Sequence, residues 1–337
     1  MAATVQQSFA KIGGVNVHIP LPAKTLAREK VTGLWIAIPT PFTPDGRLVD
    51  EDALAASVEH YVDGLEVDGI FCGGVMGEFW ALSMDERERV HELVVSQVRG
   101  RVPVMAQVGS HVFSDSVRLC EHALANEIDF GIAMNPYYPP NPPQELVRAW
   151  YEGLAAASPL PLFLFNTTYS GYALSPEQIG GLADIETVCG IKNPQAREHL
   201  LAVQELAGDR IVVTDASERH WLDLHVEHGF QALMSTPALA LYQRPGDLPV
   251  REYTALADVG QIDQARVVSS RLGPARDAFD RWMRAPWLER HVIPIAELKA
   301  WLGLLGLPQG PVRPPLVPLS REDEAELARD LDRAGLL

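Results

Sequence analysis

The chain has 337 residues, of which 47% are hydrophobic and 21% charged, so it is long enough to bury the core of one large or two ordinary domains. Its 28 Lys and Arg residues against 44 Asp and Glu residues leave a formal net charge of -16, which repels the phosphates of nucleic acid and the anionic face of a membrane. This composition excludes a disordered chain and argues against a nucleic acid or a membrane as partner.

The cysteines and the first residues indicate the compartment. Three cysteines, Cys72, Cys120 and Cys189, form no CxxC pair, and such a sparse, odd set is typical of a reducing environment. The first thirty residues contain no apolar core of a signal peptide, and no later apolar run approaches the roughly 18 residues that span a bilayer. We therefore expect a cytoplasmic protein.

From Gly33 onward, short apolar runs alternate with amphipathic stretches, which is typical of a parallel sheet covered by helices. The predicted strands cover residues 34–40, 69–73, 102–108, 130–135, 162–166, 187–192, 211–215 and 231–235. The predicted helices between them cover residues 51–63, 85–98, 114–126, 143–156, 176–182, 196–206 and 219–228. Eight such units predict an α/β fold, a closed (β/α)8 TIM barrel, whose usual size is roughly 250 residues. A doubly wound open sheet is the alternative, but no GxGxxG motif follows any of these strands.

Helix signals also organise the rest of the chain. Ser83 and Glu86 have the spacing of a capping box, and Ser175 precedes a proline at a first helical position. After Ser235 the strand signals stop, and residues 251–272, 275–283 and 295–305 are predicted helices, followed by an acidic solvated segment over residues 320–335. We therefore predict an N-terminal arm (1–32), the barrel (33–240) and a C-terminal helical region (241–337).

One lysine occupies a position that suggests chemistry. The five lysines of the chain are Lys11, Lys24, Lys30, Lys192 and Lys299. Lys192 ends an apolar predicted strand, which places its amine at the carboxyl-terminal mouth of the barrel, where barrel enzymes carry their catalytic groups. Apolar surroundings lower the pKa of an amine, and a neutral amine can attack a carbonyl to form a Schiff base. A purely structural alternative is an ion pair between Lys192 and a carboxylate such as Glu218.

Residues 72–78, CGGVMGE, follow the second predicted strand and resemble the GTTGE segment of the dihydrodipicolinate synthase and N-acetylneuraminate lyase family. Lys192 matches the Schiff-base lysine of that family. Further matches lie in order at residues 39–42, 135–138, 165–166 and 313–316. The resemblance covers residues 33–337 and implies a class I lyase or aldolase that binds pyruvate or another 2-oxo acid as an imine on Lys192. It implies no metal or organic cofactor, and a homodimer or homotetramer.

The resemblance also assigns roles to individual residues. The backbone N–H groups of Val75 and Met76 are expected to hold the carboxylate of the 2-oxo acid. Gly74, Phe165 and Met234 are further expected substrate contacts. We interpret Glu78 as a brace for the glycine-rich turn rather than as a proton carrier.

The proton relay of the family is incomplete in this sequence. The family uses a tyrosine at the end of strand five, a threonine in the turn after strand two and a tyrosine after strand four. Here Phe165 and Val75 stand at the first two positions and only Tyr138 matches, so Tyr138 is the expected catalytic hydroxyl. Phenylalanine cannot exchange that proton, and Tyr169 and Tyr172 are the alternative donors.

Several functions stay open. The synthase branch places an arginine in the strand-five loop for its aldehyde substrate, and residues 167–172 contain none, so this chain is not expected to be a dihydrodipicolinate synthase itself. Apolar residues such as Phe79 and Trp80 suit a less polar aldehyde, as in hydratase-aldolases that act on apolar unsaturated 2-oxo acids. A catalytically retired paralogue that binds a 2-oxo acid is the rival from another class. Metal-dependent hydrolysis is disfavoured, because the ten histidines do not cluster in the sequence.

Overall fold

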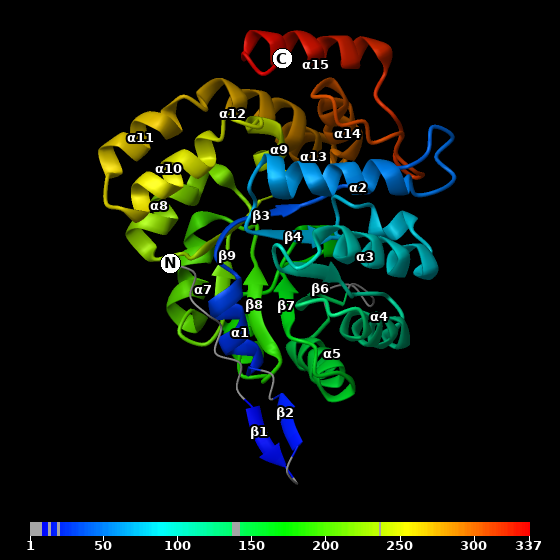
Figure 1. Ribbon diagram of the computed structural model, residues 1–337, viewed down its shortest axis with the longest axis vertical. Helices are drawn as coiled ribbons and strands as arrows, with labels where there is room; N and C mark the ends of the chain where they lie inside the picture. The colour runs from blue at the N-terminus through cyan, green and yellow to red at the C-terminus, as the bar shows by residue number, and fades with distance from the viewer. Residues whose placement is uncertain (1–8, 13–14, 19–20, 137–141, 236) are drawn as a thin grey trace.

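Eight parallel strands form the centre of the computed structural model, which describes residues 9–12, 15–18, 21–136, 142–235 and 237–337 (Figure 1). The strands are β3 (Gly33–Ala37), β4 (Gly69–Cys72), β5 (Val104–Gln107), β6 (Phe130–Met134), β7 (Leu162–Phe165), β8 (Val188–Lys192), β9 (Val212–Thr214) and β10 (Ala232–Ser235). Their order in the sheet is β10-β3-β4-β5-β6-β7-β8-β9. A bridge between Asp215 and Leu233 joins β9 to β10, so the sheet nearly closes on itself as a (β/α)8 TIM barrel.

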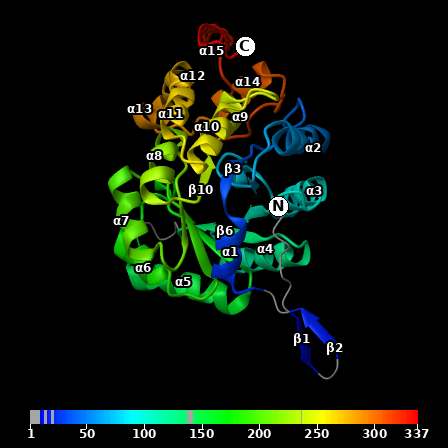
Figure 2. The same cartoon turned by 60° about the vertical axis from the view of Figure 1, so that its left-hand side comes forward.

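Helices surround this barrel. Those that follow the strands are α2 (Glu51–Glu59) with the π-helical turn η1 (His60–Gly64), α3 (Met84–Val98), α4 (Phe113–Ala125), α5 (Gln144–Ala157), α6 (Pro176–Leu182), α7 (Arg197–Ala207) and α8 (Glu218–His228). Short 3-10 turns, η2 (Phe79–Ala81) and η3 (Thr168–Ser170), lie in the loops after β4 and β7. Before β3 come α1 (Ala23–Lys30) and the antiparallel hairpin of β1 (Phe9–Ile12) and β2 (Val15–His18), which extends away from the barrel in both views (Figures 1 and 2).

The C-terminal region is helical. It contains α9 (Ala238–Tyr242), α10 (Pro249–Asp258), α11 (Ile262–Ser270), α12 (Gly273–Phe279), the π-helical turn η4 (Asp280–Arg284), α13 (Ala285–Arg290), α14 (Ile295–Leu304) and α15 (Arg321–Arg333). Figure 1 shows α12 to α15 at the end of the barrel toward which the arrows of β7 and β8 point. These helices therefore lie at the mouth that carries the carboxyl ends of the strands. Within the described residues, no helix combines the length and apolarity needed to cross a bilayer.

The sequence determines where several of these elements begin and end. The Ser83 side chain accepts from the Glu86 N–H and the Glu86 carboxylate accepts from the Ser83 N–H, which is the predicted capping box of α3. Pro176 is the first residue of α6, as predicted. All eight predicted strands are present, each ending or starting slightly inside its predicted range. The single helix predicted over residues 251–272 is wrong, because α10 ends at Asp258 and Gly260 takes a positive φ of 77° before α11 begins.

The barrel interior is packed with large aromatic side chains below the mouth. Trp35 on β3 meets Phe130 on β6 edge to face at 6.4 Å between ring centroids, and Phe130 meets Phe163 on β7 at 5.6 Å. All three are buried to 0% exposure. Such pairs fill the barrel and contribute beyond their burial, which leaves the carboxyl-terminal mouth as the end that can receive a ligand.

Candidate active site

Lys192 is the last residue of β8 and is 2% exposed. It lies opposite Phe165 of β7 and Thr214 of β9 in the parallel ladders. Its Nζ is 5.1 Å from the centroid of the Phe71 ring and 5.2 Å from that of the Phe165 ring, and the two rings pack edge to face at 5.9 Å. The amine therefore lies between two aromatic faces, which favour a cation there but offer no acceptor for its protons.

This burial changes the acidity of the amine. Desolvation lowers the pKa of Lys192 from 10.5 to about 7, while the negative charge of Asp215 acts in the opposite direction. Asp215 is itself buried, and its carboxylate accepts from the Ala216 N–H at 2.6 Å and pairs with His220 Nδ1 at 3.2 Å. At neutral pH a substantial fraction of Lys192 is therefore the neutral, nucleophilic amine.

Glu218 does not pair with Lys192. Its Oε1 lies 2.7 Å from Nη2 of Arg276, and the same oxygen accepts from the Tyr253 hydroxyl at 2.8 Å. Among the described residues Lys192 forms no ion pair within 4 Å. The purely structural alternative of a Lys192–Glu218 pair is wrong.

A cavity of about 220 Å³ opens beside Lys192. The turn after β4 contributes Val75 and Met76 to its wall, and Phe165 forms part of the wall on β7. Its volume is below the roughly 300–1,000 Å³ of clefts for drug-sized ligands, so it suits a small molecule with a few heavy atoms.

The turn between β4 and η2 needs glycine at two positions. Gly73 has a positive φ of 64°, which a residue with a Cβ rarely adopts. A Cβ on Gly74 would lie 2.4 Å from Cζ of Phe71, the ring that faces Lys192. Within the described part of the chain, the N–H groups of Val75 and Met76 donate to no acceptor. The turn therefore presents two unused donors beside the cavity, and Gly74 supports the ring that contacts the lysine.

Glu78 anchors this turn to the C-terminal region. Its Oε1 is 2.6 Å from Nζ of Lys299 on α14, and both side chains are almost completely buried. Its Oε2 accepts from the Arg313 N–H at 2.9 Å. Burial lowers the pKa of Lys299, whereas the Glu78 carboxylate favours its charged form. These contacts favour the interpretation of Glu78 as a brace.

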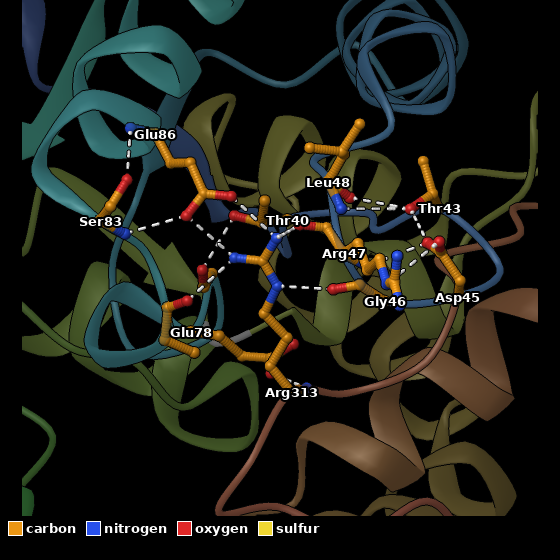
Figure 3. Close-up of polar contacts among 12 residues, drawn as sticks. Thr40, Thr43, Asp45, Gly46, Arg47, Leu48, Glu78, Ser83, Glu86 and Arg313 are labelled. Carbon is orange, nitrogen blue, oxygen red and sulfur yellow. Dashed lines mark hydrogen bonds and ion pairs between the residues drawn. The ribbon is translucent and has the colours of Figure 1, made fainter.

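Arg313 extends the same brace to α3 and to the loop after β3. Figure 3 shows its guanidinium between Glu86, with Nη2 2.8 Å from Oε1, and the backbone oxygens of Gly46 and Arg47 at 2.8 Å and 2.7 Å. Arg313 is one of the residues singled out by the sequence. Its contacts show that it fixes the glycine-rich turn and does not line the Lys192 cavity.

The loop after β7 adds hydroxyl groups to the site. Thr167, Thr168 and Tyr169 all line the Lys192 cavity. The loop is fixed by Asn166, whose Oδ1 accepts from the Leu174 N–H at 2.7 Å. Burial raises the pKa of Tyr169 to about 12, so this phenol keeps its proton at neutral pH.

Tyr172, from the same loop, is placed differently. Its hydroxyl donates to the Pro136 carbonyl at 2.6 Å. It is not among the described residues of the Lys192 cavity wall. Of the two alternative proton donors named from the sequence, the structure brings Tyr169 and not Tyr172 to the lysine.

The predicted site residues are thus partly brought together. Lys192, Val75, Met76 and Phe165 share one cavity wall, and Gly74 packs directly behind it. Met234 on β10 is completely buried and is not among the described residues of that wall. Its backbone lies at the closure of the barrel, where its N–H donates to the Asp215 backbone carbonyl at 2.9 Å. Tyr138 lies outside the described residues.

The C-terminal helices form a further part of the cavity wall, which was not predicted from the sequence. This part is formed by Met283, Arg284, Trp287 and Leu288. Trp287 meets Tyr169 edge to face at 4.4 Å between ring centroids. Met283 and Trp287 are four residues apart, which puts them on one helix face, and this apolar spacing is the only signal in the sequence that could have indicated a contact with the barrel.

Two larger cavities adjoin the Lys192 cavity and share part of its wall. One, of about 670 Å³, shares Val75 and Tyr169 with it and is lined mainly by apolar groups such as Phe79, Trp80 and Met134. The other, of about 440 Å³, shares Tyr169 and Arg284 with it and carries charged side chains. A ligand attached to Lys192 could therefore extend along an apolar or a charged wall.

A buried lysine at the mouth of a (β/α)8 barrel, beside a glycine-rich turn with unused donors, is an arrangement that suits a lyase of the class I aldolase type. The chain belongs to the Dihydrodipicolinate synthetase family, whose sequence model matches residues 30–334.

Named relatives cover almost the whole chain. A 4-hydroxy-tetrahydrodipicolinate synthase of Methanopyrus kandleri is 31% identical over 319 residues, which cover 91% of this chain and 98% of that protein. A DapA-like lyase of Halobacterium salinarum, described as uncharacterized, is 32% identical over 324 residues, which cover 95% of this chain and 99% of that protein. The dihydrodipicolinate synthase of Acinetobacter baumannii, solved in complex with pyruvate, superimposes with a TM-score of 0.78 at 25% identity and covers 91% of this chain and 100% of its own.

Proposed function

We propose that the protein is a Schiff-base-forming lyase or aldolase that acts on pyruvate or another 2-oxo acid through Lys192. The observation that carries this proposal is the burial of Lys192 between two phenyl rings, which lowers the pKa of its amine to about 7 at the edge of a small cavity. The pyruvate bound to the synthase of Acinetobacter baumannii supports the substrate class.

The chemistry begins with the neutral amine of Lys192. It attacks C2 of the 2-oxo acid to form a carbinolamine, which takes up one proton at its hydroxyl group and loses one water, and this gives a protonated imine. The imine withdraws electrons, so that a bond to the neighbouring carbon can break or form. The carboxylate is held by the N–H groups of Val75 and Met76, which are unused within the described residues.

Proton transfer needs a hydroxyl group that is neither residue 165 nor residue 75. Tyr138 stays our choice, on the resemblance stated above. Tyr169 is the competing choice, supported by its place on the wall of the Lys192 cavity and by a pKa that burial raises to about 12. The Tyr169 phenol keeps its proton at neutral pH and would therefore act first as the donor.

The same residues argue against dihydrodipicolinate synthase activity itself. Phe165 and Val75 both line the cavity and bring no hydroxyl group to it. Residues 167–172 contain no arginine for the aldehyde of the synthase reaction. A second candidate, a hydratase-aldolase for apolar unsaturated 2-oxo acids, is favoured by the apolar cavity of about 670 Å³ that adjoins the Lys192 cavity.

Reductive trapping tests the proposal. Incubation with pyruvate and borohydride reduces the imine to a stable secondary amine, and peptide mass spectrometry locates it. We expect the adduct on Lys192, its loss in Lys192→Met and its retention in Lys30→Met, which removes an exposed lysine of α1. Absence of an adduct on Lys192 with every 2-oxo acid tried would refute the lyase proposal, and trapping without any turnover would identify a retired paralogue.

A further inference from the structure

The C-terminal helices bring an arginine to the catalytic lysine. Arg284 closes the π-helical turn η4, and π-helical turns inside longer helices occur frequently at functional sites. Arg284 lines both the Lys192 cavity and the adjoining charged cavity of about 440 Å³. Its neighbours on the wall, Met283 and Trp287, are apolar. The part of the wall that comes from the C-terminal helices therefore carries a single guanidinium and is otherwise apolar.

The charges around the Lys192 cavity leave this arginine without a full counterion. Among the described residues of that cavity wall, Lys192 and Arg284 are the basic ones and no residue is acidic. The acidic partner of Arg284 is Asp280, at 3.1 Å, and Asp280 is at the same time 2.6 Å from Arg219. One carboxylate thus serves two guanidinium groups, and both arginines line the charged cavity.

The other carboxylates of the charged cavity are engaged elsewhere. Glu218 forms its short ion pair with Arg276 at 2.7 Å. Asp215 is 1% exposed and uses its oxygens for the Ala216 N–H and His220. The local group of Asp280, Arg219 and Arg284 therefore carries one more positive than negative charge, in a protein whose overall charge is -16.

A guanidinium with spare donors is the group that proteins use most to bind a carboxylate in a fixed orientation. The carboxylate beside the 2-oxo group already has its donors in the turn after β4. We propose that Arg284 binds a second carboxylate, at the far end of the substrate, and that the protein acts on 2-oxo acids with an anionic tail. This inference rests on the proposed function, because the tail is placed relative to the imine on Lys192.

Arg284 would then do, from the C-terminal region, what an arginine of the strand-five loop does in the synthase branch. The competing arrangement is a neutral tail along the apolar cavity that contains Phe79 and Trp80. Two tails of equal length, one anionic and one neutral, distinguish these arrangements.

The test measures reductive trapping on Lys192 as a function of concentration for pyruvate, 2-oxoadipate and 2-oxohexanoate. The last two have chains of equal length and differ in the terminal carboxylate. We expect half-saturation by 2-oxoadipate at a concentration about tenfold below that for 2-oxohexanoate, as suits one charge-assisted contact at a partly exposed side chain. In Arg284→Gln this preference should fall to within about twofold.

Two variants complete the design. Arg284→Lys keeps the positive charge but loses the bidentate hydrogen-bonding geometry of the guanidinium, so part of the preference for 2-oxoadipate should remain. Arg290→Gln is the control, because Arg290 lines the apolar cavity of about 670 Å³ and neither of the other two cavities. The preference of this variant for 2-oxoadipate over 2-oxohexanoate should equal that of the wild type. Equal half-saturation by the two six-carbon acids in the wild type, or an unchanged preference in Arg284→Gln, would overturn the inference and leave the proposed function intact. Failure to trap any of the three acids would overturn both.

Discussion

Replacing Lys192 by methionine should stabilise the fold, and the gain should depend on pH. The amine has a pKa of about 7 when buried against 10.5 when exposed, as it is in the unfolded chain. At about 1.4 kcal/mol per pH unit, this difference in pKa corresponds to about 5 kcal/mol. The folded state is less stable by this amount when the buried amine is protonated. Methionine has a similar length and no charge, so Lys192→Met removes this penalty.

The sign follows from proton binding. Below pH 7 the folded and unfolded states both carry the proton on Lys192, and the folded state bears the whole penalty. Between pH 7 and 10.5 only the unfolded state keeps it, so the wild type gains stability with rising pH relative to the variant, by about 1.4 kcal/mol per unit. The advantage of Lys192→Met should therefore be largest at pH 7 and below, and about 3 kcal/mol smaller at pH 9.

Urea unfolding at pH 6, 7, 8 and 9 measures this difference, with Lys30→Met as the control that removes an exposed lysine. We expect the control to differ from the wild type by less than about 1 kcal/mol at each pH. An advantage of Lys192→Met that stays constant from pH 6 to 9, or a loss of stability in that variant at pH 7, would refute the assignment of a depressed pKa to Lys192.

Three further predictions concern the relay, the brace and the substrate. Tyr138→Phe should leave reductive trapping on Lys192 intact and lower turnover by about 10²-fold or more in steady-state assays, whereas a loss confined to Tyr169→Phe would assign the relay to Tyr169. Lys299→Met should lower the free energy of unfolding by about 3–5 kcal/mol, because the buried Glu78 carboxylate loses its counterion. Adding Glu78→Gln to this variant should restore much of the lost stability. A loss below about 1 kcal/mol in urea unfolding would contradict the role of this ion pair as a brace. Turnover of pyruvate with aspartate semialdehyde should lie orders of magnitude below the typical range of about 1–10³ s⁻¹, and an ordinary synthase rate would show that the missing hydroxyls and arginine are dispensable.

The barrel could be predicted because its determinants are local. Each strand is a short, mainly apolar and buried run, and the covering helices have a repeated apolar face. The strand-end position of Lys192 followed from the same pattern. The division of the chain at residues 32/33 and 240/241 stays a prediction, whereas the hairpin of β1 and β2 was not foreseen within the N-terminal arm.

The wall from the C-terminal helices could not be predicted, because it depends on tertiary packing. No local pattern states that the turn Asp280–Arg284 contributes side chains to the cavity beside Lys192 on β8, more than 80 residues earlier in the chain. The substrate contact predicted for Met234 stays a prediction. Met234 lies in the last barrel strand, as predicted, but the barrel closes around it and its side chain is completely buried and not among the described residues of the cavity wall.

A crystal structure of the protein soaked with pyruvate tests the central claim most directly. The account predicts continuous electron density from Nζ of Lys192 to C2 of pyruvate, with the pyruvate carboxylate within hydrogen-bond distance of the Val75 and Met76 N–H groups and the methyl carbon facing the open cavity. Pyruvate bound noncovalently, or attached to a different residue, with an unmodified Lys192 between Phe71 and Phe165, would contradict it.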